Sequence, residues 1–230
     1  MRPSLPQLSL GAALAALLLA APAARGATPP GKLPSVVELY NLVHAGQPVA
    51  QKDGAWTVAL ASGPLPATVD LPNGYLAFGE GGSEPRGAAA LFVTADQRAL
   101  LADYLDSGAS AELRFYEYRE GKAPPVAQAL IPRLDGAALL VPGQDARPLA
   151  EHDVFDVLPF KYELPRVGTT IVATLATEFV RMNIGMSRRP DAAKDQLYPF
   201  VEKSLYDRVE LKFDAKKGAF TVGKKSRSAK

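Results

Sequence analysis

The chain has 230 residues, with 26 Lys or Arg against 24 Asp or Glu, a formal net charge of +2 and 47% hydrophobic residues. This ordinary hydrophobic content and small net charge exclude a wholly disordered chain. The chain holds no cysteine, which excludes a disulfide scaffold, a cysteine-ligated metal site and a thiol nucleophile. Its 19 Gly and 20 Pro exceed the usual share and indicate many turns.

Residues 1–26 have the features of a secretory signal peptide. Arg2 supplies a short positive start, and residues 8–21 form a 14-residue apolar segment. That length fits a signal sequence and falls short of the roughly 20 residues that span a bilayer. Small-residue cleavage sites follow at 21–23 and 24–26. We therefore expect a periplasmic or secreted protein.

Two absences favour a bacterial envelope protein. The three asparagines all lie outside Asn-x-Ser/Thr sequons, and an exported chain without disulfides is less typical of eukaryotic secretion. The lack of cysteine also rules out a lipid anchor attached to a Cys after the signal. No transmembrane segment is expected after signal cleavage, because the most apolar later stretch, 167–186, is interrupted by Glu178, Arg181 and Asn183.

The first half of the mature chain alternates turn signals with short apolar segments. Ser35 and Glu38 have the spacing of a capping box and predict a helix over 36–45. Thr94 to Gln97 resembles a second capping box, and the apolar spacing after it predicts a helix that ends at Gly108. Strands are expected at 56–61, 67–71, 75–78, 88–93 and 111–117, with a turn at 72–74 and a loop at 79–87.

The second half predicts more strands and two helices. We expect a strand pair at 126–131 and 137–141 around Asp135 and Gly136, and an extended segment at 154–164. Apolar spacing favours a helix over 170–183, and Asp191 is expected to cap a helix that Pro199 kinks or ends. The clearest hairpin pairs 208–214 with a short strand carrying Phe220 and Val222.

These elements predict the α+β class: a mainly antiparallel β-sheet with two to four helices and a C-terminal β-hairpin. The chain shows no fixed-period repeat, so we expect a single domain over 34–224. A subdivision, if there is one, would fall near 142–148. Residues 225–230 are expected to form a basic C-terminal tail.

Candidate catalytic chemistry is confined to one acidic segment. His152 lies among Glu151, Asp153 and Asp156, a set that could bind a divalent metal or pair a base with an orienting acid. Ligands must converge in space, and neighbouring residues of an extended segment point to opposite faces. A solvated acidic loop is therefore the favoured interpretation, and no catalytic residue, metal or cofactor is assigned. His44 is expected to interact with the C-terminal dipole of the first helix.

The strongest asymmetry of the chain is its charge distribution. Residues 27–211 hold 17 basic and 23 acidic residues, whereas residues 212–230 hold seven basic residues and Asp214 alone. A basic end of this kind can bind lipopolysaccharide or anionic lipid head groups, although it can also serve only to keep an edge strand soluble. The residues expected to contact an anionic partner are Lys216, Lys217, Lys224, Lys225, Arg227 and Lys230.

The favoured function is a non-enzymatic binding or assembly module of the bacterial envelope, with an anionic envelope surface or a partner protein as its target. Nucleic acid is not expected as a partner after export. One alternative is an exported hydrolase that uses the acids around His152, with or without a bound divalent metal. Another is an immunity-like or inhibitor protein that binds its partner through a loop such as 79–87.

Overall fold

The computed structural model describes residues 33–79, 86–108, 110–126, 129–150, 158–186 and 191–228. The chain from Lys32 onward forms one compact unit. The signal segment 1–26 lies outside the described residues. Within the described chain the architecture is α+β with mostly antiparallel strands, which confirms the expected class.

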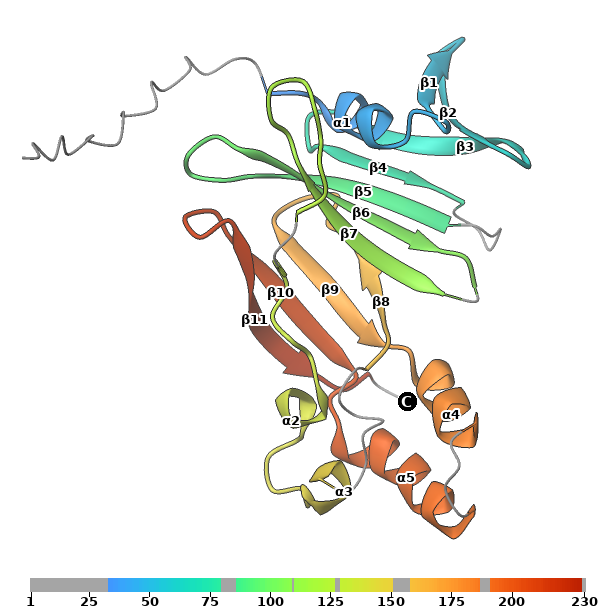
Figure 1. Cartoon of the computed structure of the whole chain (residues 1–230), viewed down its shortest axis with the longest axis vertical. Helices are drawn as coiled ribbons and strands as arrows, with labels where there is room; N and C mark the ends of the chain where they lie inside the picture. Colours follow the sequence, from blue (N-terminus) through green and yellow to red (C-terminus); the bar gives the residue numbers. More distant parts are fainter. Residues whose placement is uncertain are drawn as a thin grey trace, which may run out of the picture. The chain divides into compact units, whose positions relative to one another are not determined.

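The larger sheet of the described chain is a seven-stranded antiparallel meander (Figure 1). Its strands pair in sequence order, each joined to the next by a short connection. They are β1 (Val49–Lys52), β2 (Ala55–Leu60), β3 (Gly63–Asp70), β4 (Tyr75–Phe78), β5 (Arg86–Val93), β6 (Ala99–Asp106) and β7 (Ala111–Glu117).

Helix α1 (Val36–Val43) covers one face of this sheet. Ser35 accepts a hydrogen bond from the Glu38 amide while the Glu38 carboxylate accepts one from the Ser35 amide, so the expected capping box is confirmed. Val36, Leu39 and Tyr40 of the helix are buried against apolar residues of β2, β4, β5 and β6. The helix thus closes the first of two apolar clusters.

The smaller sheet has four antiparallel strands in the order β11-β10-β9-β8. Helices lie before and between its strands (Figure 1). In chain order these elements are α2 (Gly136–Leu139), α3 (Arg147–Ala150), β8 (Phe160–Glu163), β9 (Thr170–Leu175), α4 (Thr177–Met186), α5 (Asp191–Ser204), β10 (Arg208–Asp214) and β11 (Ala219–Ser226). The expected C-terminal hairpin is confirmed as β10 and β11.

The second apolar cluster joins the two sheets. It combines residues of β5 and β6 with residues of β8 to β11 and of helices α4 and α5. The Phe92 ring of β5 lies 5.1 Å from the rings of both Phe213 and Phe220, centroid to centroid. The turns that precede β6 and β11 are therefore held close to each other by buried aromatic contacts.

The helix predicted after Thr94 is wrong, because residues 99–106 form strand β6, which pairs with β5 and β7 on its two sides. Leu101 faces the cluster beneath α1, whereas Leu100 and Tyr104 face the cluster between the sheets. A strand that is buried on both faces is apolar at successive positions, so its sequence also matches helical spacing. Gln97, with φ of 62°, turns the chain from β5 into β6 instead of starting a helix.

Two further expectations fail in the second half. The strand pair around Asp135 is replaced by α2, whose amide of Ala138 donates to the Asp135 carboxylate over 2.8 Å. The segment predicted as one helix is divided into β9 and α4, because Thr170–Leu175 completes the sheet between β8 and β10. The helix expected from Asp191 is present as α5 and continues through Pro199 to Ser204, so of the two options given for this proline the helix end is excluded.

Candidate functional site

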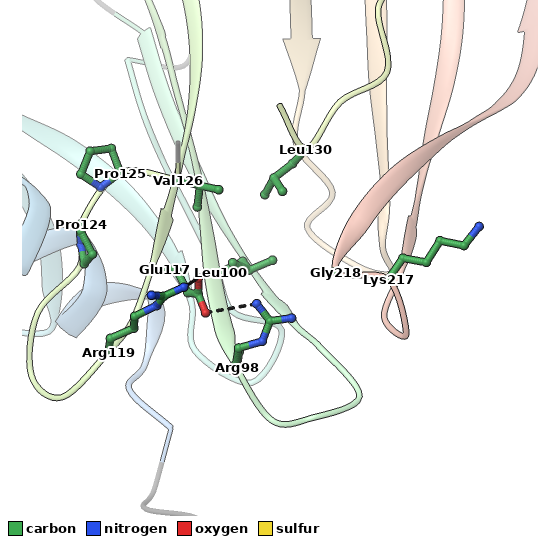
Figure 2. A pocket seen from close by; sticks show the side chains of 10 residues that line it. All are labelled: Arg98, Leu100, Glu117, Arg119, Pro124, Pro125, Val126, Leu130, Lys217 and Gly218. Atoms are coloured by element: carbon green, nitrogen blue, oxygen red, sulfur yellow. Dashed lines mark hydrogen bonds and ion pairs between the residues drawn. The ribbon is translucent and has the colours of Figure 1, made fainter. Parts of the chain in front are cut away.

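A pocket of about 430 Å³ opens where the start of β6 and the end of β7 approach the β10–β11 turn (Figure 2). One wall is polar and comes from the larger sheet, and the other is mostly apolar and comes from the segment that follows β7. Its lining residues are Arg98, Leu100, Glu117, Arg119, Pro124, Pro125, Val126, Leu130, Lys217 and Gly218.

The turn between β5 and β6 places Arg98 at the pocket. The Arg98 amide donates to the Thr94 hydroxyl over 2.9 Å, and the Thr94 amide donates to the Arg98 carbonyl over 3.0 Å. The Asp96 carboxylate accepts from the Thr94 hydroxyl and, over 2.9 Å, from Nε of Arg98. These short-range bonds fix the direction of the Arg98 side chain before it reaches any residue of β7.

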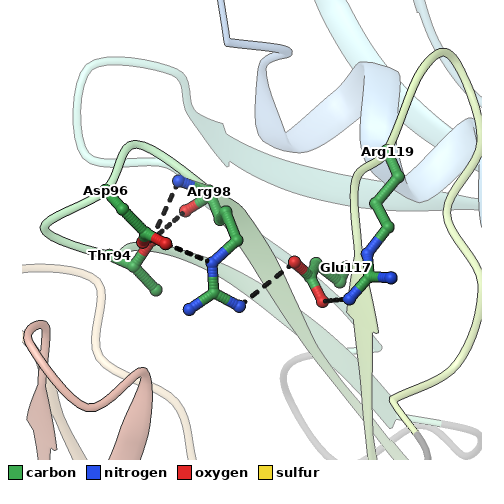
Figure 3. A network of polar contacts seen from close by, with 5 residues as sticks. All are labelled: Thr94, Asp96, Arg98, Glu117 and Arg119. Atoms are coloured by element: carbon green, nitrogen blue, oxygen red, sulfur yellow. Dashed lines mark hydrogen bonds and ion pairs between the residues drawn. The ribbon is translucent and has the colours of Figure 1, made fainter. Parts of the chain in front are cut away.

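Glu117 lies between two guanidinium groups (Figures 2 and 3). Its Oε1 accepts from Arg98 over 3.1 Å and its Oε2 accepts from Arg119 over 2.6 Å. The Glu117 side chain is only 8% exposed, whereas those of Arg98 and Arg119 are 42% and 68% exposed. Asp96, Arg98, Glu117 and Arg119 therefore form a chain of alternating charges with a buried carboxylate at its centre.

The two arginines set the protonation state of Glu117. Burial alone would raise the pKa of this carboxyl, but hydrogen bonds from Arg119 and Arg98, with the charges of both, outweigh burial and hold the pKa below its ordinary value. Contact with the acids raises the pKa of Arg98 in turn. Glu117 is therefore ionised at neutral pH and is a poor general base, since both its oxygens already accept charged donors.

The β10–β11 turn closes the opposite side of the pocket. Asp214 accepts hydrogen bonds from the amides of Lys216 and Lys217, and the turn ends at Gly218 with φ of 63°. A Cβ at Gly218 would lie 3.2 Å from Nη2 of Arg98. The Ala95 amide also donates to the Ala215 carbonyl over 2.8 Å. The two turns therefore contact each other directly.

The segment after β7 forms the apolar wall. The Glu117 amide donates to the Pro124 carbonyl over 3.1 Å, and the Val126 amide donates to the Phe115 carbonyl over 2.8 Å. These bonds hold residues 124–126 along the edge of β7. Pro124 and Pro125 are exposed and Val126 is half-buried, so apolar surface lies beside the two guanidinium groups.

Of the basic residues predicted to bind an anionic partner, Lys216 and Lys217 lie at this turn. Lys216 is exposed. The Lys217 ammonium points away from Arg98 in Figure 2, and its Nζ lies 3.7 Å from Oδ2 of Asp214. Lys217 therefore lines the pocket but leaves the polar wall to Arg98 and Arg119.

The remaining predicted residues do not join them. Lys225 and Arg227 lie at the other end of β11, whose eight residues span about 26 Å. The Lys225 ammonium donates to the Ala138 carbonyl, and the Arg227 guanidinium donates to the Glu202 carbonyl over 2.8 Å. Lys224 is exposed, and Lys230 lies outside the described residues. Contact of these basic residues with an anionic partner stays a prediction. Residues 225 and 226, expected to begin the tail, belong to β11.

The candidate acidic site cannot be placed. His152, Asp153 and Asp156 lie outside the described residues, as does most of the loop 79–87. Among the residues that the structure describes, no group of three or more His, Asp or Glu side chains could hold a metal ion. His44 contacts Asp103, with 2.9 Å between its Nε2 and Oδ2 of the acid. This partner on β6 was not foreseen from the sequence.

Arg98 and Glu117 were missed by sequence reasoning. Arg98 fell within the helix predicted after Thr94, and Glu117 was assigned only to a half-buried strand. The available signal was the acidic residue two positions from a basic one in both Asp96-Arg98 and Glu117-Arg119. In extended backbone such residues share a face, so the Glu117-Arg119 pattern indicates paired charges once β7 is known. Asp96 and Arg98 are instead brought together by the turn between β5 and β6.

Comparisons with known proteins assign no function to the chain. No family model matches it, and no curated protein is similar to it. Among solved structures it is similar to a domain of an uncharacterized protein from Porphyromonas gingivalis W83, with a TM-score of 0.46 and 10% sequence identity. The match covers 77% of this chain and 79% of the other. No helix of the described chain is long and apolar enough to cross a membrane.

Proposed function

We propose that the chain is a non-enzymatic binding module, exported to the bacterial envelope, that contacts an anionic envelope component through the face around the β10–β11 turn. Export rests on the apolar segment 8–21 and the cleavage sites that follow it. Binding rests on four basic residues at this face. Arg98, Arg119 and Lys217 line one pocket, and Lys216 is an exposed neighbour in the β10–β11 turn.

The observation that carries the proposal is the surplus of cationic donors at the pocket. Two guanidinium groups have about ten N–H donors, and the bonds to Asp96 and Glu117 use three of them. Lys216 adds an exposed ammonium beside the turn. Donors that are held in place by neighbouring acids lose little conformational entropy when they bind an anion.

The state of the buried carboxylate supports binding over catalysis. A general base must accept a proton at the working pH, whereas the pKa of Glu117 is held below its ordinary value by two arginines. The arrangement recognises charge and offers no proton acceptor of suitable basicity among the groups that line the pocket.

The test is sedimentation with vesicles of phosphatidylglycerol and phosphatidylcholine at low salt. Each lysine near an anionic surface contributes about 1 kcal/mol, so the double variant Lys216→Ala/Lys217→Ala should bind roughly 30-fold more weakly. Lys224→Ala is the matched control, because Lys224 is exposed on the same hairpin and distant from the pocket. Binding that survives loss of the turn lysines, or that is equal on neutral vesicles, would contradict the proposal.

Export has a separate test. Cell fractionation of a bacterial host that expresses the full chain should place the protein in the periplasm or the medium, with residues up to about the cleavage sites at 21–26 removed. Mass spectrometry of the purified protein reads the new N-terminus directly. A full-length chain in the cytoplasm would overturn this part of the proposal.

A further inference from the structure

The pocket combines a charged wall with an apolar wall, and this combination specifies more than a general attraction to anions. Arg98 and Arg119 face the pocket with the donors that Asp96 and Glu117 leave. Residues 124–126 lie beside them with two exposed prolines. A ligand that used both walls would need one anionic group and one apolar part.

We propose that this pocket binds a small amphiphilic anion, with a carboxylate or phosphate head group on Arg98 and Arg119 and an apolar chain along residues 124–126. The inference rests on the proposed function in one respect, because the same two arginines take part in both. The volume of about 430 Å³ falls within the range of pockets that enclose small organic ligands.

The geometry of the arginines favours a carboxylate or phosphate head. A guanidinium group is a planar fork whose parallel donors match two oxygens of such an anion. Nε of Arg98 is bonded to Asp96 and one terminal nitrogen to Glu117, which leaves its other terminal nitrogen directed at the Gly218 side of the pocket. The Arg119 side chain is 68% exposed and bonded to Glu117 through one nitrogen.

Glu117 acts as a resident competitor in this arrangement. Its carboxylate occupies donors that an incoming anion could share, and its negative charge opposes that anion across the pocket. Removing this charge while keeping a side chain of the same shape should therefore tighten anion binding. A network with only a structural role predicts the opposite, because loss of the carboxylate would loosen the arginines without creating any affinity.

The apolar wall of the pocket is held in place by backbone hydrogen bonds and by its prolines. Residues 124–126 are bonded to β7 at the Pro124 and Val126 positions, and proline has a fixed φ and little side-chain entropy to lose. An alkyl chain that packs on it would remove apolar surface from water at both partners. Head and tail should therefore both be required for measurable affinity.

The experiment is calorimetric titration of the full chain with octyl phosphate and with octanoate, each below its micelle concentration. Inorganic phosphate tests the head alone, octanol the tail alone, and octyltrimethylammonium the same tail with a positive head. We expect at least one octyl anion to bind at least tenfold more tightly than phosphate or octanol, and the cation not to bind. The tighter of the two anions identifies the head group. Absence of binding by both anions, or equal binding of the cation, overturns the inference.

Variants then locate the binding. Arg119→Gln and Arg98→Gln should each weaken binding of the octyl anion at least fivefold, whereas Arg114→Gln should leave it unchanged, because Arg114 lies on β7 outside the pocket and is paired with Glu112. Arg119 is mostly exposed, so its variant remains informative if Arg98→Gln fails to fold. Glu117→Gln should tighten binding at least threefold. Unchanged binding in both arginine variants overturns the inference.

The result is separable from that of the proposed function. Octyl-anion binding that is lost in Arg119→Gln, together with vesicle binding that depends on Lys216 and Lys217, supports both. Vesicle binding without any octyl-anion binding overturns the ligand inference alone. Octyl-anion binding with no difference between anionic and neutral vesicles overturns the proposed function and retains the pocket.

Discussion

At the β10–β11 turn, Lys216 is exposed and Lys217 lines a pocket with Arg98 and Arg119, whereas at the far end of β11 the Lys225 ammonium and the Arg227 guanidinium donate to backbone carbonyls. Both groups belong to the same basic stretch of sequence. The hairpin separates them by about the length of one strand, some 26 Å. Basic residues that are close in sequence can thus lie exposed at one end of the hairpin and be bonded to backbone carbonyls at the other.

The two ends of the hairpin differ because they contact different parts of the chain. The turn contacts the β5–β6 turn and lies across the pocket from the end of β7. In these two segments, Asp96 and Glu117 hold two arginines in place. The far end meets carbonyls at α2 and near the end of α5. Carbonyls at helix ends lack partners within the helix and carry the negative end of its dipole. The cationic groups of Lys225 and Arg227 therefore stabilise helices α2 and α5.

The largest expected effect on stability comes from Glu117, whose carboxylate lies at the pocket beside the β10–β11 turn. Glu117→Gln should lower the free energy of unfolding by about 2 to 3 kcal/mol at neutral pH, because it removes charged hydrogen bonds at a buried position. Chemical denaturation measures this loss. Glu112→Gln is the matched control on the same strand, with its side chain 57% exposed, and should change stability by less than about 0.5 kcal/mol.

The same variant predicts a pH dependence. The pKa of Glu117 is lowered in the folded protein from an ordinary value of 4.5. Its contribution is therefore complete at neutral pH and is lost as the pH falls through 4.5 and below. The stability difference between the wild type and Glu117→Gln should shrink over that acidic range. A difference that grows on acidification would contradict the assigned ion pairs.

A smaller effect is expected where the two turns touch. Gly218→Ala should cost about 1 to 2 kcal/mol, because its φ of 63° disfavours a side chain and its Cβ would crowd Arg98. Gly121→Ala has a similar φ of 79° with no atom within 4 Å, and so separates backbone strain from crowding. The loss of unfolding free energy should be larger for Gly218→Ala, and equal losses in the two variants would contradict the close approach of Gly218 to Arg98.

At the far end of β11, we expect a substitution to lower the stability of the protein without weakening its binding to vesicles. Lys225→Met should lower the free energy of unfolding by about 1 kcal/mol, since it removes a donor to the Ala138 carbonyl. Lys224→Met, at the exposed neighbouring position, should have no measurable effect on stability. The distinction between the two ends fails if Lys225→Met leaves stability unchanged and weakens vesicle binding instead.

Local signals in the sequence predicted the elements that depend on local chemistry. The capping box at Ser35 and Glu38 and the hairpin of β10 and β11 form as expected, because short-range bonds and strict alternation determine them. β6 was mistaken for a helix because burial on both faces removes the alternation that marks a strand. The candidate site depends on β6 and β7 lying next to each other, so an error in one strand concealed Arg98 and its partner Glu117.

The lack of cysteine in the chain permits the most direct test of the difference between the two ends. Ala215→Cys and Ser228→Cys place single thiols at the turn and at the far end, both exposed, and each can carry an environment-sensitive fluorophore. On addition of phosphatidylglycerol vesicles, the label at 215 should report an apolar, water-depleted environment while the label at 228 stays as in solution. An equal response at both positions, or a response at 228 alone, would contradict the assignment of binding to the turn.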